Sequence, residues 1–236
     1  MDSGINIIPL SNLAIAFIPV VIVILIMLRW SLNATDGIVA VGRMLLQLLL
    51  IGYLLNWIFA AESALIVLVI LSVMLCAASW IALRPLKEPG WKEFRRALAA
   101  ILIAGCLTLF LVTGLVLETD PWYAPRQVIP LAGMIFASAM NAVSITAERL
   151  AAELDRGAEP DTARRQAFQA GLIPLLNSLL AVGLVSLPGM MTGQILSGIE
   201  PLIAARYQIV VMCMITGAAG MAAAIYLQLT LRGTQS

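Results

Sequence analysis

Residues 63–83 read SALIVLVILSVMLCAASWIAL and contain no Asp, Glu, Lys or Arg. An α-helix needs about 20 mostly apolar residues to cross the hydrocarbon core of a bilayer, so this stretch predicts a transmembrane helix. Comparable charge-free stretches recur along the chain, at residues 4–28, 44–61, 97–117, 127–147, 166–199 and 207–231. The run 166–199 is too long for one crossing. The pattern predicts an all-α polytopic membrane protein of about seven transmembrane helices, organised as a single transmembrane domain over residues 1–236.

The amino-acid composition also indicates an integral membrane protein. Of its 236 residues, 61% are hydrophobic and 11% are charged, and the mean hydropathy is +1.00. A soluble domain carries about a quarter charged residues. The formal net charge of +1 leaves no basic excess for a nucleic-acid partner, and membrane lipids are the expected surroundings.

The basic residues predict the orientation of the chain. If the loop 84–96 (RPLKEPGWKEFRR) is cytoplasmic and the spans alternate, twelve of the fourteen basic residues lie inside and only Arg126 and Arg206 lie outside. Because cytoplasmic loops of membrane proteins are enriched in Lys and Arg, the N-terminus is predicted outside and the C-terminus in the cytoplasm.

Several kinds of chemistry are missing from the sequence. It has no His, and its only lysines, Lys87 and Lys92, do not follow the glycine of a phosphate-binding loop. The predicted spans contain no carboxylate, although an ionisable residue at membrane depth is typical of proton- or ion-coupled carriers. The sequence therefore predicts no catalytic residue, no cofactor bound by this chain and no secondary carrier. Energy for transport would come from a partner.

The least regular region follows residue 171. A helix that begins there is expected to cross by residue 187 and to stop at Ser186-Leu187-Pro188-Gly189, because proline lacks an N–H and glycine favours a turn. The next residues, 190–199, are still apolar. Irregular backbone at membrane depth is tolerated only where protein buries it or water solvates it, so the sequence predicts a re-entrant element or a short hairpin that lines a pathway.

Uncharged polar residues inside the spans have two interpretations. Hydrogen bonding between helices is the favoured one, and lining of a pathway is the alternative. The methionines, including the pair Met190-Met191, are more often packing residues than soft metal ligands. The candidate pathway residues are Gln47, Gln127, Asn141, Ser186, Pro188, Gly189, Met190, Met191 and Gln194.

The longest polar segment, residues 148–170, reads as two short helices broken at Gly157, with Pro160 at the first position of the second. The positive-inside pattern places this segment in the cytoplasm.

Three stretches resemble a known family. They are VGRMLLQLLLIGYLL at 41–55, QVIPLAGMIFASAMN at 127–141 and, most distinctively, AVGLVSLPGMMTGQILSGIEPLIAARYQ at 181–208. They are similar to the FetB-like (YbbM/UPF0014) permeases of ABC transporters, a family associated with iron export in bacteria and aluminium tolerance in plants. The resemblance implies a multi-pass protein of the bacterial inner membrane and a homodimer of permeases. It also implies a separate ATPase subunit that binds ATP and Mg.

The resemblance also implies that the segment 148–170 is a coupling helix seated on the ATPase. The candidate coupling residues are Glu153, Asp155, Arg156, Gly157, Ala158 and Pro160. The family's usual run is Leu-x-Leu-Gly-Ala-Thr-Pro, whereas this chain has LDRGAEP at 154–160 and is about one turn shorter.

The sequence does not determine which molecule is transported. Metal paths are ordinarily built from carboxylates or imidazoles, and here the candidate acids, predicted at the outer face, are Glu62, Glu118, Asp120 and Glu200. No metal site is predicted with these residues. Iron export is the leading hypothesis, with a chelate, a lipid-like molecule or a sugar nucleotide as other cargoes, and a non-transporting scaffold that recruits an ATPase as the alternative function.

Overall fold

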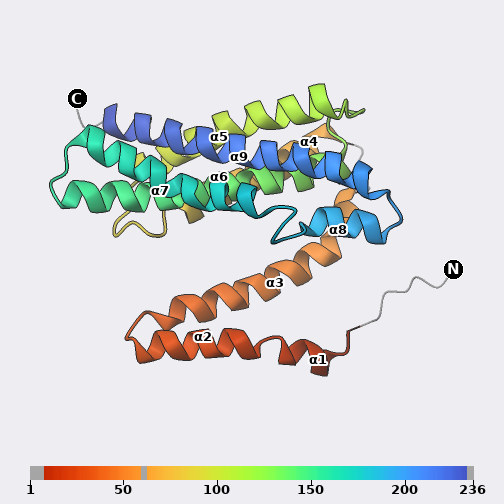
Figure 1. The fold of residues 1–236 in the computed structure, drawn as a ribbon, viewed down its shortest axis with the longest axis horizontal. Coiled ribbons are helices and arrows are strands. Elements are labelled where there is room, and N and C mark those ends of the chain that lie inside the picture. The colour runs from red at the N-terminus through yellow and green to blue at the C-terminus, as the bar shows by residue number, and fades with distance from the viewer. Residues whose placement is uncertain (1–7, 60–62, 233–236) are drawn as a thin grey trace. The chain divides into compact units, whose positions relative to one another are not determined.

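The computed structural model describes residues 8–59 and 63–232. Every regular element among them is helical, which confirms the predicted fold class. In chain order the helices are α1 (Leu10–Ile15), α2 (Ile18–Arg29), α3 (Ala34–Phe59), α4 (Ala64–Ala82), α5 (Trp91–Phe110), the π-helix η1 (Leu111–Val116), α6 (Pro125–Asp155), α7 (Pro160–Ala181), α8 (Gly189–Leu196) and α9 (Pro201–Arg232) (Figure 1). The chain forms two compact units, Met1–Ala60 and Ala61–Ser236.

The first unit contains α1, α2 and α3. Its first predicted span is interrupted after Ile15, and α2 begins at Ile18. Pro19 explains the interruption, because it has no N–H to donate to the Ile15 carbonyl one turn earlier. α2 and α3 then pack as a pair, with Gly37 against the Met27 side chain. The helices of this unit are otherwise exposed and apolar, as expected of spans in lipid.

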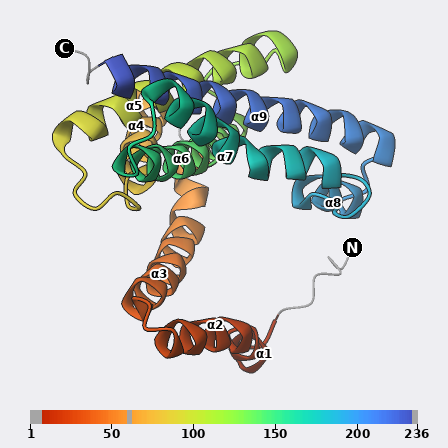
Figure 2. The same ribbon diagram turned by 60° about the vertical axis from the view of Figure 1, so that its left-hand side comes forward.

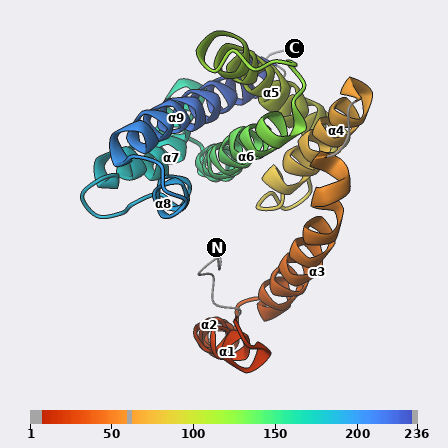
Figure 3. The same cartoon turned by 90° about the vertical axis from the view of Figure 1, so that its right-hand side faces the viewer.

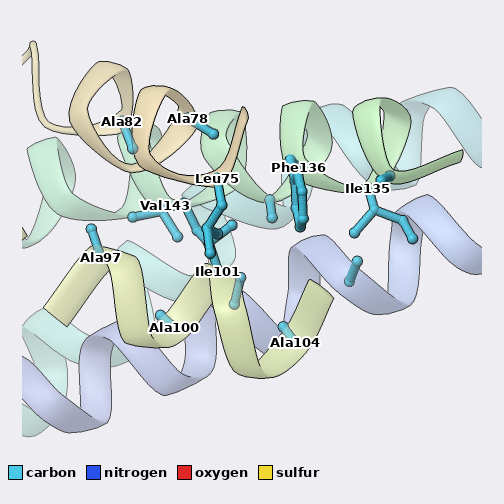
Figure 4. Close-up of a cluster of buried hydrophobic side chains, with 14 of the residues drawn as sticks. Leu75, Ala78, Ala82, Ala97, Ala100, Ile101, Ala104, Ile135, Phe136 and Val143 are labelled. Atoms are coloured by element: carbon cyan, nitrogen blue, oxygen red, sulfur yellow. The ribbon is translucent and has the colours of Figure 1, made fainter. Parts of the chain in front are cut away.

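The second unit is a bundle in which α6 contacts α4, α5, α7 and α9 (Figure 3). Its core is built largely from small residues. Ala78 and Ala82 of α4 face Ala97, Ala100 and Ala104 of α5 across the side chains of α6 (Figure 4). Without a hydrophobic driving force between helices in lipid, such small residues let the backbones approach closely.

The small-residue run of α9 is buried in the same bundle. Ala218, Ala219, Ala222 and Ala223 have no exposed surface, and α9 contacts both α5 and α6 along this stretch. Because these small side chains leave space at the helix surface, two helices of the same chain approach α9 closely along this run.

Within the described residues, six helical stretches are long and apolar enough to cross a membrane: Leu10–Arg29, Ala34–Leu55, Ala64–Ala82, Trp91–Val116, Pro125–Asp155 and Pro201–Arg232. The predicted crossing at residues 172–187 differs from these. Its helix, α7, begins twelve residues earlier in a charged segment, at Pro160, and ends at Ala181. α7 nevertheless runs along the bundle beside α9, between the α6–α7 turn and the α8 end (Figure 2).

The predicted cytoplasmic segment 148–170 is divided at Gly157, whose φ of +80° suits glycine, and Pro160 opens the second helix as predicted. The two helices are not short, however. They are the ends of α6 and α7, which continue into the bundle because their apolar residues continue the same helical pattern. The WKEFRR sequence is likewise the start of α5, capped by the Gly90 N–H donating to Glu93 Oε2 at 3.1 Å.

The two ends of the second unit differ in charge. The α4–α5 connection, the α6–α7 turn and the end of α9 lie at one end, and the α5–α6 connection, α8 and the start of α9 lie at the other (Figure 1). The first end carries Arg84, Arg156, Arg165 and Arg232. Within this unit, the segments that the charge pattern assigns to one side of the membrane therefore lie together.

Candidate functional site

The break predicted at Pro188-Gly189 is present and is wider than expected. α7 ends at Ala181, and α8 begins only at Gly189. Between them the chain closes a tight turn, in which the Gly183 N–H donates to the Ser186 carbonyl at 2.9 Å and the Val185 N–H donates to the Ala181 carbonyl at 2.8 Å. Gly183 has a φ of +83°, a conformation that favours glycine. The irregular backbone thus satisfies some of its own polar groups, as membrane depth requires.

On one side of α8 lies a cavity of about 300 Å³, here called the α8 cleft. It brings together Gln127 of α6 with Met190 and Gln194 of α8, three of the predicted pathway residues. The other lining residues are Leu117, Arg126, Pro130, Leu131, Met134, Tyr207, Val210 and Val211.

The polar groups of the α8 cleft are donors and neutral acceptors. Gln127 is oriented by Thr119, whose hydroxyl donates to Gln127 Oε1 at 3.0 Å. The Gln194 Oε1 atom is buried and has no hydrogen-bond partner in the described part of the chain. Pro130 has no N–H, so the Arg126 carbonyl lacks its usual helical donor. With one guanidinium and no carboxylate among its lining residues, the cleft suits a neutral or anionic solute.

On the other side of α8 lies a second cavity, of about 350 Å³, between the end of α7, α8 and α9. Pro188 and Met191 line it, so the two adjacent methionines face different cavities. Its lining is mostly apolar, but it includes Gln208 of α9. Gln208 is buried, and its Oε1 has no hydrogen-bond partner in the described residues. An unpaired buried amide oxygen is costly, which marks this position as one that a ligand or water would satisfy.

Asn141 does not join the α8 cleft. It lines a smaller cavity of about 140 Å³ at the middle of the unit, with Ser138 of α6, Ser178 and Pro174 of α7, and Thr216 of α9. Pro174 lies inside α7 and cannot donate to the carbonyl one turn earlier, so this cavity also collects polar groups beside an interrupted helix.

The remaining predicted pathway residues line none of these three cavities. Ser186 and Gly189 are exposed in the α7–α8 connection and at the start of α8. Gln47 is exposed on α3 of the first unit. Their assignment to a pathway stays a prediction.

Three of the four predicted outer-face acids are described. Glu118, Asp120 and Glu200 are exposed, and Glu118 has a φ of +45° in the α5–α6 connection. Glu62 lies outside the described residues. Within residues 8–59 and 63–232 no group of three His, Cys, Asp or Glu side chains is placed to hold a metal ion.

The α6–α7 turn has a buried anchor and an exposed tip. Glu153 is 7% exposed and forms ion pairs with Arg149 at 2.7 Å and with Arg156 at 3.2 Å. With its amide nitrogen turned toward the carboxylate, Gln166 of α7 also donates to Glu153 Oε2 at 2.9 Å.

The tip of the turn consists of Asp155, Arg156, Gly157, Ala158, Glu159 and Pro160, all exposed except the half-buried Ala158. Among the six predicted coupling residues, Glu153 therefore faces the protein, while the tip is open to a partner.

The sequence profile of the uncharacterised protein family UPF0014 matches residues 10–234. The chain belongs to the UPF0014 family. It is 36% identical to the UPF0014 membrane protein slr1647 of Synechocystis sp., over 80% of each chain. It is 35% identical to "Probable iron export permease protein FetB" of Escherichia coli, over 94% of this chain and 90% of that one. No solved structure shows a significant match.

A plant relative extends the family beyond bacteria. Protein ALUMINUM SENSITIVE 3 of Arabidopsis thaliana is 33% identical over 85% of this chain and 78% of its own length. These relatives confirm the resemblance to FetB-like permeases and the multi-pass membrane location. As a UPF0014 protein, the chain is a permease-type membrane protein.

The sequence did not identify several residues that line the α8 cleft. Arg126 entered only as a topology marker, and Tyr207 and Met134 were not singled out, yet all three line the α8 cleft. Arg126 and Gln127 precede Pro130 by one turn, so a helix-interrupting proline next to polar residues was the signal that could have found them.

Proposed function

We propose that this UPF0014 permease is the membrane subunit of an ATP-driven exporter, and that it works with a separate ATPase subunit. Two copies of each subunit form the transporter, and the ATPase binds ATP and Mg. The observation that carries the proposal is the α6–α7 turn, an exposed tip held by ion pairs to the buried carboxylate of Glu153, in a chain of a permease-type family. The absence of a phosphate-binding loop from the sequence supports the need for a partner.

The α6–α7 turn has the properties that force transmission requires. Glu153 holds Arg149 of α6, Arg156 of the turn and Gln166 of α7 at one carboxylate, so the turn moves with both helices. Both helices continue to the far end of the unit, where α6 lines the α8 cleft and α7 ends at the break before α8. α6 and α7 therefore connect the tip to the cavities as continuous helices.

The cargo that fits the α8 cleft is an iron complex that is neutral or anionic. The name of the E. coli relative supplies the connection to iron. The cleft supplies the charge argument, because Arg126 disfavours a bare divalent cation and the lining contains no oxygen anion to bind one. The amides of Gln127 and Gln194 and the Tyr207 hydroxyl are suited to hydroxyl or carboxylate groups of an organic ligand.

The proposed orientation places the α6–α7 turn in the cytoplasm and the α8 cleft toward the outer face. The charge pattern supports it, since the turn, the 84–96 loop and Arg232 lie at the basic end of the second unit.

The decisive experiment is co-purification of the tagged permease with an ATPase, followed by ATP hydrolysis in lipid discs with and without iron citrate. We expect a phosphate-loop ATPase to be retained and its hydrolysis to rise with iron citrate. Asp155→Lys at the tip should reduce ATPase retention, whereas Asp120→Lys at the opposite end serves as the matched control. Retention without stimulation by any cargo would favour the scaffold function, and absence of an ATPase would refute the proposal.

A further inference from the structure

We infer that the groove between the start of α7 and the end of α9 binds the headgroup of an anionic phospholipid. The groove has a volume of about 230 Å³ and is lined by Arg164, Arg165 and Phe168 of α7 and by Ala224, Leu227 and Gln228 of α9. This site is distinct from the α8 cleft, which is lined by α6, α8 and the start of α9. α8 lies at the opposite end of α9 from the C-terminus (Figure 2).

The rim of the groove is cationic. Arg164 pairs with Asp161 at 3.0 Å, so its charge is partly compensated. Arg165 is exposed and forms no ion pair in the described part of the chain. A third guanidinium is close by, because Gln228, with its amide oxygen turned toward Arg232, accepts hydrogen bonds from Arg232 Nε at 2.9 Å and from its terminal nitrogen at 3.2 Å.

The floor of the groove is apolar. Phe168 packs on the cluster of Leu150, Ala163, Ala167, Leu227 and Leu231, which joins the ends of α6, α7 and α9. Ala224 leaves the opening beside Phe168 unobstructed, since its side chain is a single methyl group on an exposed position. A cationic rim above an apolar floor matches a phosphate followed by a glycerol backbone and the first carbons of an acyl chain.

The depth of the groove favours a lipid over a soluble anion. α9 is a candidate span that ends at Arg232, and Ala224 to Gln228 lie four to eight residues before that end. At 1.5 Å per residue, these positions lie about 35–41 Å along α9 from its start, which is about the distance across the hydrocarbon core to the opposite headgroup region, whichever way the protein is oriented. Guanidinium groups bind phosphate oxygens through paired hydrogen bonds, and basic pockets between helices at this depth are suited to anionic lipids.

The test is native mass spectrometry of the detergent-purified permease titrated with phosphatidylglycerol or phosphatidylcholine. We expect tighter retention of phosphatidylglycerol by the wild-type protein and about a fivefold loss of that affinity in Arg165→Gln, since one interfacial arginine contributes about that factor. The matched control is Arg95→Gln, which removes an exposed arginine from the start of α5 at the same end and should leave the affinity within about twofold of wild type.

A second variant tests the groove without changing charge. Ala224→Trp should fill the opening and weaken phosphatidylglycerol binding, whereas Ala77→Trp on an exposed face of α4 should not. Equal losses from Arg165→Gln and Arg95→Gln would show non-specific attraction and overturn the inference. It would also be overturned if glycerol 3-phosphate displaced the lipid at equal concentration, or if Arg165→Gln released the ATPase while lipid binding was unchanged.

Discussion

Gly171 of α7 lies so close to Thr146 of α6 that a Cβ atom at position 171 would overlap the Thr146 hydroxyl oxygen, and it would lie 3.2 Å from the Ala142 carbonyl. Both residues are buried. The two helices that leave the α6–α7 turn therefore make backbone-level contact about three turns below it. The turn and this contact together hold α6 and α7 as one pair.

Gly171→Ala should destabilise the protein by about 1–3 kcal/mol, because the added methyl group has no space and the helices must separate. Thermal unfolding of the purified permease in detergent measures the effect. Gly193→Ala on α8 is the matched control, since nothing lies within 4 Å of a Cβ there, and it should not lower stability. Thr146→Ala should restore part of the loss in the double variant; strict additivity of the two changes would contradict the contact.

Glu153→Gln should loosen the α6–α7 turn. The carboxylate accepts from Arg149 and Arg156, and hydrogen bonds to charged groups contribute about 1.5–3 kcal/mol each, so we expect a loss of about 2 kcal/mol for the partly exposed network. Amide hydrogen exchange should become faster at Gly157 and Ala158, whose N–H groups donate to the carbonyls of Leu154 and Glu153 at 3.0 Å. Glu159→Gln, on the exposed tip, is the control. Unchanged exchange in Glu153→Gln would show that the network does not hold the turn.

The membrane fold was largely predictable because its signal is compositional. Each of the helices α2, α3, α4, α5, α6 and α9 overlaps a charge-free stretch, although α3, α5, α6 and α9 extend beyond theirs by six to ten residues at one end. The charged segment 160–170 was predicted as a short helix beginning at Pro160, but its continuation into the following apolar stretch as one helix, α7, was not predicted. A hydropathy argument cannot assign PDTARRQ to a helix that later enters the bundle, because only tertiary packing on α6 and α9 decides it.

The candidate site was predictable only in part. The break at Pro188-Gly189 could be read from proline and glycine chemistry, and it correctly drew attention to Met190 and Gln194. The partners of these residues come from α6 and α9, more than a dozen residues away in the chain, and no local pattern says that Arg126 and Tyr207 share their cavity. Met190 and Met191 face different cavities, and which cavity each one faces likewise depends on how α8 packs on α9.

Single cysteines along α8 should react with a water-soluble maleimide in a helical pattern. Positions 190 and 194 face the α8 cleft, and we expect them to react faster than position 195, which lines neither cavity flanking α8. The measurement is the labelling rate in lipid discs, in a background where Cys76, Cys106 and Cys213 have been replaced, because all three are exposed. Uniform protection of the segment would indicate that α8 lies in lipid and lines no aqueous cavity.

Arg126→Ala should weaken binding of an anionic iron complex by about tenfold or more, because a hydrogen bond between charged groups contributes about 1.5–3 kcal/mol. The binding of iron citrate to the permease in lipid discs measures this effect, with Arg206→Ala as the matched control. Arg206 is an exposed arginine at the start of α9 that does not line the α8 cleft, so its loss lowers the charge of the same end without changing the cavity. The same variant should bind bare ferrous iron more tightly than the wild-type protein does, since removing Arg126 removes a repulsive charge. Tighter binding of bare ferrous iron than of iron citrate by the wild-type protein would contradict the charge argument, and the cargo would then have to bind elsewhere than in the α8 cleft.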